Sequence, residues 1–328
     1  MHIETSKRSL VHRWMRIGVV AALLAMPWPD VHAEDESAPD QPQGILPIPD
    51  YTGDIWTAQR LTGDWGGART DLADKGIQLD INFTQTMQSV VDGGNSTGTR
   101  YGGSFDYLLT LDLMRMGVMP GAMIKFRGET RYGEAANDIS GSGLPVNSDG
   151  FFPLKAPLDE NIPFTLTNLT YYQFLSEHFG VFLGKVDTLD GDPNEFASGR
   201  GNTQFMNGSL VFPTSPLVAM PAYSTLAAGI IVMPTKNITV SSVVLNAADS
   251  STTTGFEDFG EGTAWMTEAQ FQYRLGNLPG GQNVGILYAF DKTFLDLNGR
   301  FTFERGQGIT PPTTDETWAL YWSTWQYL

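Results

Sequence analysis

Apolar and polar residues alternate with a period of two along most of this chain. In residues 77–84, "IQLDINFT", the apolar side chains fall on odd positions and the polar ones on even positions. Successive side chains of a β-strand point to opposite faces, so the alternation predicts a strand with one apolar and one polar face. The same pattern predicts further strands at 105–113, 122–132, 164–175, 181–189, 224–234, 238–248, 263–275, 284–294 and 317–328.

The connections between these ten predicted strands are of two lengths. Short turns join eight of the strands into four hairpins. Longer connections, near 133–163, 190–223 and 249–262, are rich in Gly, Pro, Asn, Asp and Ser. Short turns on one side and long loops on the other are typical of an antiparallel up-and-down β-barrel that spans a membrane. A soluble β-sandwich is the alternative, because its strands alternate too.

Three features favour the barrel over the sandwich. The strands are about ten residues long, aromatic residues gather near their ends, and charged residues form rows on one face. No stretch after Ala33 has the eighteen or so consecutive apolar residues of a transmembrane helix, so a helical membrane protein is excluded.

The N-terminal residues indicate export. Residues 1–33 combine four basic residues, the apolar stretch "IGVVAALLAM" and the small-residue ending "VHA", as in a cleaved signal peptide. Residues 34–60 are acidic and Pro-rich, which predicts a flexible lead-in. We expect a tight turn and a short helix over 61–76, and barrel strands over 77–328.

Charge and composition exclude several functions. The net charge is -16, and removal of the signal, with four basic and two acidic residues, takes it to -18, so nucleic acid is not an expected partner. The chain has no cysteine, and only His178 of its four histidines lies outside the signal. A multi-histidine metal site is therefore excluded, and neither a nucleophile elbow nor a good triad is present. The stretch "DGDPNEF" from Asp190 lacks the glycine and the final glutamate of a calcium loop. We expect no enzyme activity, no cofactor and no metal.

Several segments together resemble the OprB-type carbohydrate-selective porins of Gram-negative outer membranes. They are, in order, "LTGDWGGARTDLADKGI" from Leu61, "LTNLTYYQ", "VFLGKVDTLD", "RGNTQFMNGSLVF", "EAQFQYRLG", "VGILYAFDKTFLD" and the final "ALYWSTWQYL". The resemblance implies a sixteen-stranded barrel in the outer membrane that passes glucose and related sugars down their gradient. It also implies contact with outer-membrane lipid and with the barrel assembly machinery, and it leaves a homo-oligomer open. A general, weakly selective porin and, less favoured, a secreted sugar-binding β-sandwich are the alternatives.

Ten strands fall short of sixteen, and the ending "TWQYL" lacks the terminal aromatic residue usual in outer-membrane barrels. We therefore expect a partial version of a longer porin that ends within its strand region.

The polar faces of the predicted strands supply the candidate lining of the channel. Residues at i and i+2 lie roughly 6.5–7 Å apart on one face, so charges at alternate positions form an inward row that can hydrogen-bond sugar hydroxyls. Pairing of these charges with one another is the alternative role. The candidates are Asp80, Asn82, Asp106, Asp112, Lys125, Arg127, Glu129, Arg131, Glu268, Gln270 and Arg274.

The stretch "GDWGGAR" is expected to mark the junction between the lead-in and the barrel wall. Its glycines permit a tight turn before a helix that Gly76 closes. We expect Trp65 to act as a packing anchor at the periplasmic mouth, with Asp64 and Arg69 paired to each other or to charges of the wall. Among aromatic residues, Tyr171, Trp318 and Trp322 are candidates for the inner face, although a lipid-facing belt is the favoured position.

Overall fold

The computed structural model describes residues 44–54, 56–155, 161–191, 194, 196, 200–211, 214–296, 298–306 and 308–328. All of these belong to one compact unit, residues 42–328. The predicted signal peptide and most of the acidic part of the lead-in lie outside the described residues.

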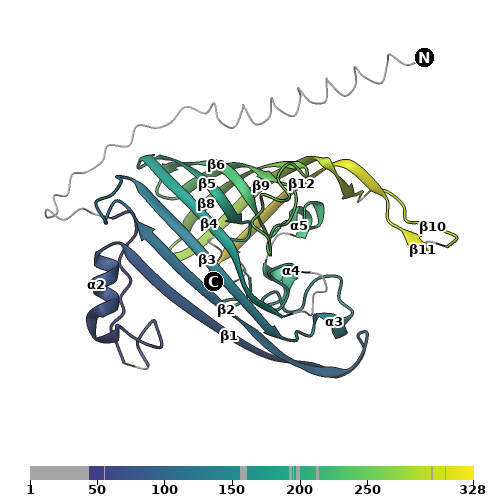
Figure 1. Cartoon of the computed structure of the whole chain (residues 1–328), viewed down its shortest axis with the longest axis horizontal. Coiled ribbons are helices and arrows are strands. Elements are labelled where there is room, and N and C mark those ends of the chain that lie inside the picture. The colour runs from purple at the N-terminus through teal and green to yellow at the C-terminus, as the bar shows by residue number, and fades with distance from the viewer. Residues whose placement is uncertain are drawn as a thin grey trace, which may run out of the picture. The chain divides into compact units, whose positions relative to one another are not determined.

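Ten long strands and a few short helices make up this unit (Figure 1). The helical elements are a 3-10 turn η1 (Trp65–Gly67), α2 (Ala68–Asp74), α3 (Asn137–Ser140), α4 (Gly208–Val211) and α5 (Thr214–Ala219). The strands of the main sheet are β1 (Ile77–Val90), β2 (Gly98–Asp112), β3 (Ala122–Gly133), β4 (Ile162–Ser176), β5 (Phe179–Asp187), β6 (Ser224–Thr235), β7 (Ile238–Asn246), β8 (Thr263–Leu275), β9 (Leu278–Leu295) and β12 (Thr313–Gln326). No helix among the described residues has the length and apolar character needed to cross a membrane.

The ten strands form one antiparallel sheet in the order of the chain, from β1 through β9 to β12. Each of the ten predicted strands is present, and the up-and-down arrangement is confirmed. Within the described residues β1 and β12 each pair on one side only, so the sheet is open between them. The elements that were not predicted are the short helices α3, α4 and α5 and a small ribbon of β10 (Thr302–Glu304) and β11 (Gly308–Thr310) in the connection before β12.

The outer face of the sheet is apolar and exposed. Large apolar side chains on alternate positions of β1, of β4 to β9 and of β12 remain accessible, which is what strands facing lipid require. They include Ile81, Phe83, Leu169, Leu183, Ile230, Val244, Phe271, Val284, Trp318, Leu320 and Trp322. Towards the long-loop end of β1 to β4 an aromatic cluster forms, in which the rings of Phe83 and Phe105 stack with centroids 4.5 Å apart. Such a belt is typical of a membrane interface.

The exposed fractions of two tryptophan side chains near the C-terminus show which face of β12 they occupy. Trp318 and Trp322 are 58% and 64% exposed and belong to the outer face, so they do not point inward. Trp325, whose ring packs edge-on against Phe196 of the β5–β6 connection, takes the inner position on β12 instead.

A β-bulge in β4 changes which residues face inward. Arg127 pairs with Asn168 but Gly128 pairs with Leu166, so β4 has one extra residue at Thr167. Beyond a bulge the alternation shifts by one position. As a result Tyr172, not Tyr171, lies on the inner face, and Tyr171, an inward candidate by strict alternation, takes the outer position that was favoured for aromatic residues.

The turn before β1 is built as its glycines predict. Trp65, Gly66 and Gly67 all adopt positive φ, which is easy for glycine and uncommon for other residues. Helix α2 follows at once, and the Asp64 carboxylate accepts hydrogen bonds of 2.8 Å from the backbone N–H and the hydroxyl of Thr70 in its first turn. Gly76, with φ of 86°, ends the helical segment.

Candidate functional site on the concave face

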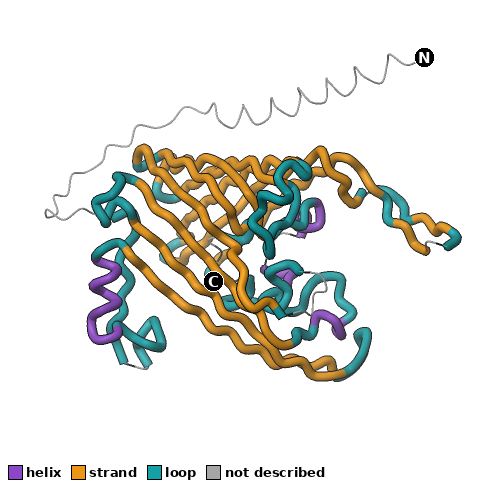
Figure 2. Tube along the Cα trace, viewed as in Figure 1, coloured by secondary structure: helices purple, strands orange, loops and turns teal. Residues whose placement is uncertain are grey.

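Several long connections of the sheet fold back over its concave face (Figure 2), whereas the connection that carries β10 and β11 projects away from the sheet (Figure 1). Two of them, 134–161 and 188–223, hydrogen-bond to each other, since the backbone N–H of Ser148 donates to the carbonyl of Met206 at 2.8 Å. Side chains of both connections also bond to the inner face of the strands. The inner face is therefore a contact surface for loops over much of its area.

The basic residues of β3 contact acidic residues at the start of the β5–β6 connection. Lys125 Nζ lies 2.6 Å from Asp190 Oδ2. The guanidinium of Arg127 binds the buried carboxylate of Asp187 at the end of β5, and its second nitrogen lies 3.8 Å from Asp190. These pairs hold the first residues of the connection against the sheet.

Arg200, further along the same connection, joins two acidic residues of the wall. Its guanidinium lies 2.5 Å from Asp106 of β2 and 2.6 Å from Glu129 of β3. All three residues are buried: Arg200 is 6%, Asp106 0% and Glu129 2% exposed. The amide of Asn202 donates to the other Asp106 oxygen at 2.8 Å. Buried charges need such partners, because desolvation of an unpaired charge is costly.

Tyr223, the residue before β6, links the two groups of charges. Its hydroxyl donates to Glu129 at 2.7 Å and lies 3.1 Å from Asp187. Burial raises the pKa of the Tyr223 hydroxyl well above its ordinary value, so it stays a donor. A continuous buried network thus connects β2, β3 and β5 with both ends of the 188–223 connection.

Asp190 has the most exposed side chain of the acidic residues in this network. Burial alone raises the pKa of its carboxyl, but the charges of Lys125 and Arg127 outweigh burial and lower that pKa to about 2. Next to it, the carbonyl of Gly191 accepts a hydrogen bond of 3.0 Å from Gln270 on β8. We call residues 187–191 the crossbar, because they are bonded to β3 on one side and to β8 on the other.

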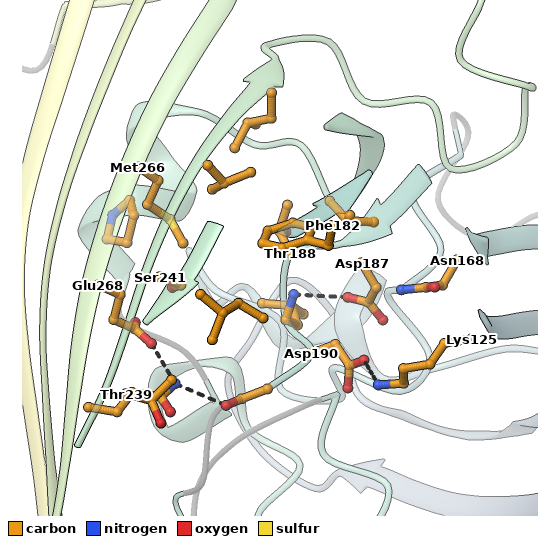
Figure 3. A pocket seen from close by; sticks show the side chains of 18 of the residues that line it. Lys125, Asn168, Phe182, Asp187, Thr188, Asp190, Thr239, Ser241, Met266 and Glu268 are labelled. Atoms are coloured by element: carbon orange, nitrogen blue, oxygen red, sulfur yellow. Dashed lines mark hydrogen bonds and ion pairs between the residues drawn. The ribbon is translucent and has the colours of Figure 1, made fainter. Parts of the chain in front are cut away.

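Two hollows lie beside the crossbar, and both are lined by residues from it. The smaller has a volume of about 220 Å³ and is lined almost wholly by polar residues, among them Asn82, Arg127, Arg200, Asn202 and Gln204. The larger has about 390 Å³ and combines polar residues with an apolar wall (Figure 3). Lys125 and Asp190 point toward each other at its edge, and Glu268 lies on the opposite strand.

Part of the inner face of β7, β8, β9 and β12 is apolar, and the C-terminal end of α5 packs against it. Ala219 and Met220, at and just after the end of α5, pack on Val243, Leu245 and Leu287 in a buried cluster. Leu287 is only 1% exposed. This apolar cluster was not predicted, because the sequence reading assigned every inward position a polar role.

Five of the predicted lining residues border the hollows: Asn82, Lys125, Arg127, Glu268 and Gln270. Asp106 and Glu129 lie beneath the connection, bound to Arg200. Arg131 donates to the backbone carbonyls of Phe151 and Pro153 at 2.9 and 3.0 Å and so holds the β3–β4 connection. Contact of any of these side chains with sugar stays a prediction.

The other predicted residues gather at the short-turn end of the sheet. Asp80 of β1 binds Arg60 at 2.6 Å and Arg69 at 2.5 Å. The Arg69 guanidinium lies between two aromatic rings, 4.5 Å from the centre of Tyr51 and 5.0 Å from that of Trp65. Trp65 itself is 46% exposed, so it packs on arginine without being buried.

Asp112 and Arg274 also belong to turns. Asp112 accepts hydrogen bonds from the backbone N–H of Arg115 at 2.9 Å and of Leu46 at 3.2 Å, which holds the lead-in to the turn after β2. Arg274 donates to the carbonyl of Asn277 in the β8–β9 turn.

Sequence reasoning missed five residues at the end of β5 and in the connection that follows it: Asp187, Asp190, Arg200, Asn202 and Tyr223. Their signal was available, since "DTLD" and "RGN" place charged residues within a segment rich in Gly, Pro and Asn. An isolated arginine in a long loop opposite acidic strands is a candidate for folding inward. The acidic residues 192 and 195 of the calcium-loop comparison lie outside the described residues.

Comparison with known proteins shows which family the chain belongs to. The model of the family described as "Carbohydrate-selective porin, OprB family" matches residues 96–326. This chain belongs to the OprB family. None of the curated proteins matches the chain. A structure of OprB from Pseudomonas putida at high pH is similar over 82% of this chain, with 19% identity and a TM-score of 0.65. A second structure of that protein, at low pH, aligns over 81% of this chain with 15% identity and a TM-score of 0.45.

OprB membership places the chain in the outer membrane and makes its strands those of a transmembrane β-barrel. The family is one of channels, not of enzymes. The chain spans 66% of the length of the high-pH Pseudomonas putida structure, somewhat less than two thirds of it.

Proposed function

We propose that this protein is a passive, carbohydrate-selective channel that admits glucose and related sugars to the periplasm and does no covalent chemistry. The observation that carries the proposal is the smaller hollow beside the crossbar. Its lining supplies arginine, amide and carboxylate groups, which together donate and accept hydrogen bonds as sugar hydroxyls do. Ion pairing fixes these groups before a sugar arrives, which reduces the entropic cost of binding.

Asn82 is the residue of this hollow best placed to bind sugar. It lies on the inner face of β1, opposite Asp106 in the register. Among the residues that the structure describes, its side chain makes no hydrogen bond. The charged groups around it are held by ion pairs. An amide in this position can exchange bonds to water for bonds to a sugar hydroxyl at little net cost.

The remaining assignments follow from this proposal. Outer-membrane lipid covers the apolar outer face, the barrel assembly machinery inserts the protein, and residues 1–33 direct its export. A homo-oligomer is compatible with the proposal, and nucleic acid is not a partner. We also propose that the segment 61–76 acts at the periplasmic mouth, because it is bonded to the short-turn end of β1 through Asp80.

Recording from planar bilayers tests the function. We expect open-channel current that falls as glucose is added over the millimolar range, as a sugar occupying the hollow excludes ions. Current that glucose does not change would favour the general, weakly selective porin. Absence of any current would contradict the channel itself.

A pair of variants on β1 localises the effect. Asn82→Ala is expected to weaken the glucose block about 5- to 10-fold, which corresponds to one hydrogen bond of about 1 to 1.5 kcal/mol. Thr84→Ala is the matched control, because Thr84 shares the inner face but does not line either hollow. Equal block by the wild type and Asn82→Ala would remove Asn82 from the sugar path.

A further inference from the structure

The larger hollow has a composition that a plain sugar does not need. One wall is apolar, with contributions from Phe182 of β5, Ile231 of β6, Met266 of β8 and Leu287 of β9. The hydroxyl groups of a sugar pressed on this wall would lose their bonds to water without replacement, which costs free energy. The apolar wall therefore indicates a ligand with an apolar part.

Methionine gives this wall an adaptable surface. Met123 of β3, Met220 after α5 and Met266 all line the hollow, together with the rings of Phe174 and Phe182. Methionine is flexible and polarizable, and its sulfur makes favourable contacts with aromatic rings. The volume of the larger hollow, about 390 Å³, is within the range of small-molecule sites, roughly 300 to 1,000 Å³. These properties suit a flat aromatic group.

The opposite rim of the same hollow is polar. Glu268 accepts hydrogen bonds from Gln270 at 2.8 Å and from the Tyr321 hydroxyl at 2.7 Å, so its carboxylate is fixed in place. Lys125 and Asp190 lie at the edge formed by the crossbar (Figure 3). Groups that bind hydroxyls thus face an apolar wall across one cavity.

We propose that the larger hollow is a binding site for aryl glycosides, with the sugar at the rim of Lys125, Asp190 and Glu268 and the aromatic group on the methionine-lined wall. This inference rests on the proposed function, because it assigns the same channel a substrate class that carries an apolar group. It adds a preference that the smaller, polar hollow does not provide.

Titration calorimetry of the full chain in detergent tests the preference. The two probes are methyl β-D-glucoside and 4-nitrophenyl β-D-glucoside, each also titrated into detergent alone. Burial of the aromatic ring is expected to make the aryl glucoside bind at least about tenfold more tightly. Equal affinities for the two glucosides would overturn the inference while the proposed sugar channel stands.

Two methionine variants locate the site. Met266→Gln keeps the length of the side chain but makes the wall polar, and it is expected to remove most of the tenfold preference while leaving methyl glucoside binding unchanged. The matched control is Met119→Gln in the turn after β2, where Met119 is 45% exposed and does not line the hollow. A full preference in Met266→Gln would show that the ring binds elsewhere and would overturn the assignment. Binding of neither glucoside to the wild type would contradict both the inference and the proposed function.

Discussion

The concave face of the sheet has two halves, which bind the segments that cover them through different kinds of interaction. On β2, β3 and β5 the cover is attached by buried ion pairs, centred on Arg200 between Asp106 and Glu129. On β7, β8, β9 and β12 the cover is α5, attached by apolar packing around Leu287. One connection, residues 188–223, contributes to both covers. The charged half therefore gives directional, pH-dependent contacts, and the apolar half gives contacts that depend on area and shape.

The largest expected effect is the loss of the central arginine of the charged half. Arg200→Ala leaves Asp106 and Glu129 buried without their cation, which is expected to lower the free energy of unfolding by about 3–5 kcal/mol. Urea unfolding of the protein in detergent micelles measures this. Arg100→Ala is the control, since its pairs with Glu134 and Asp138 are more exposed and are expected to contribute less than about 1 kcal/mol. Equal losses in both variants would show that burial of the network is unimportant.

In the apolar half, Leu287→Ala is expected to lower the free energy of unfolding by about 2–4 kcal/mol, from lost burial and the cavity left beneath α5. The effect should not depend on pH between 3 and 7. Leu320→Ala on β12 is the counterpart, because Leu320 is 64% exposed on the outer face. Destabilisation by Leu320→Ala as large as that by Leu287→Ala would argue against α5 as the main packing partner.

Acid separates the two halves. The pKa of Asp190 is lowered from 3.8 to about 2 in the folded chain, so its pair with Lys125 stabilises the fold at pH values above about 4. That contribution, on the order of 1–2 kcal/mol, is lost as the pH falls from about 4 through 2. Hydrogen exchange should then increase around residues 188–191 before it increases around α5. Simultaneous opening of both segments would mean that the connection responds to acid as one unit.

The smallest expected effect concerns the tether of the crossbar to β8. Gln270→Ala removes the hydrogen bond to the Gly191 carbonyl and should cost about 1 kcal/mol, while noise in the open-channel current rises as the crossbar moves more. Gln282→Ala on β9 is the control, because Gln282 accepts a hydrogen bond from Trp322 on the outer face. Unchanged current noise in Gln270→Ala would show that the pairs of Asp190 alone fix the crossbar.

The sequence predicted the strands well and the inner face less well. Lys125, Arg127, Glu129 and Arg131 of β3 all lie on the inner face, as predicted, because the alternation of this strand is regular. Tyr171 was an inward candidate by strict alternation, but the bulge at Thr167 shifts the alternation and places Tyr171 outside, and a bulge leaves no mark in a hydrophobic pattern. Met266 and Leu287 were read only as members of strands. Their inward side chains are apolar because they pack into or against the buried cluster that includes Ala219 and Met220 at the end of α5.

The sequence by itself determined the ten strands, their order, the lipid-facing side and the family, because alternation and short motifs are local properties of the chain. Only the tertiary structure decided what covers the inner face. Arg200 meets Asp106 across 94 residues, and Gln270 meets Gly191 across 79. Such contacts depend on how a long connection closes over a curved sheet. That closure follows from the pairing of buried charges and the packing of apolar surface in three dimensions, neither of which a periodic pattern encodes.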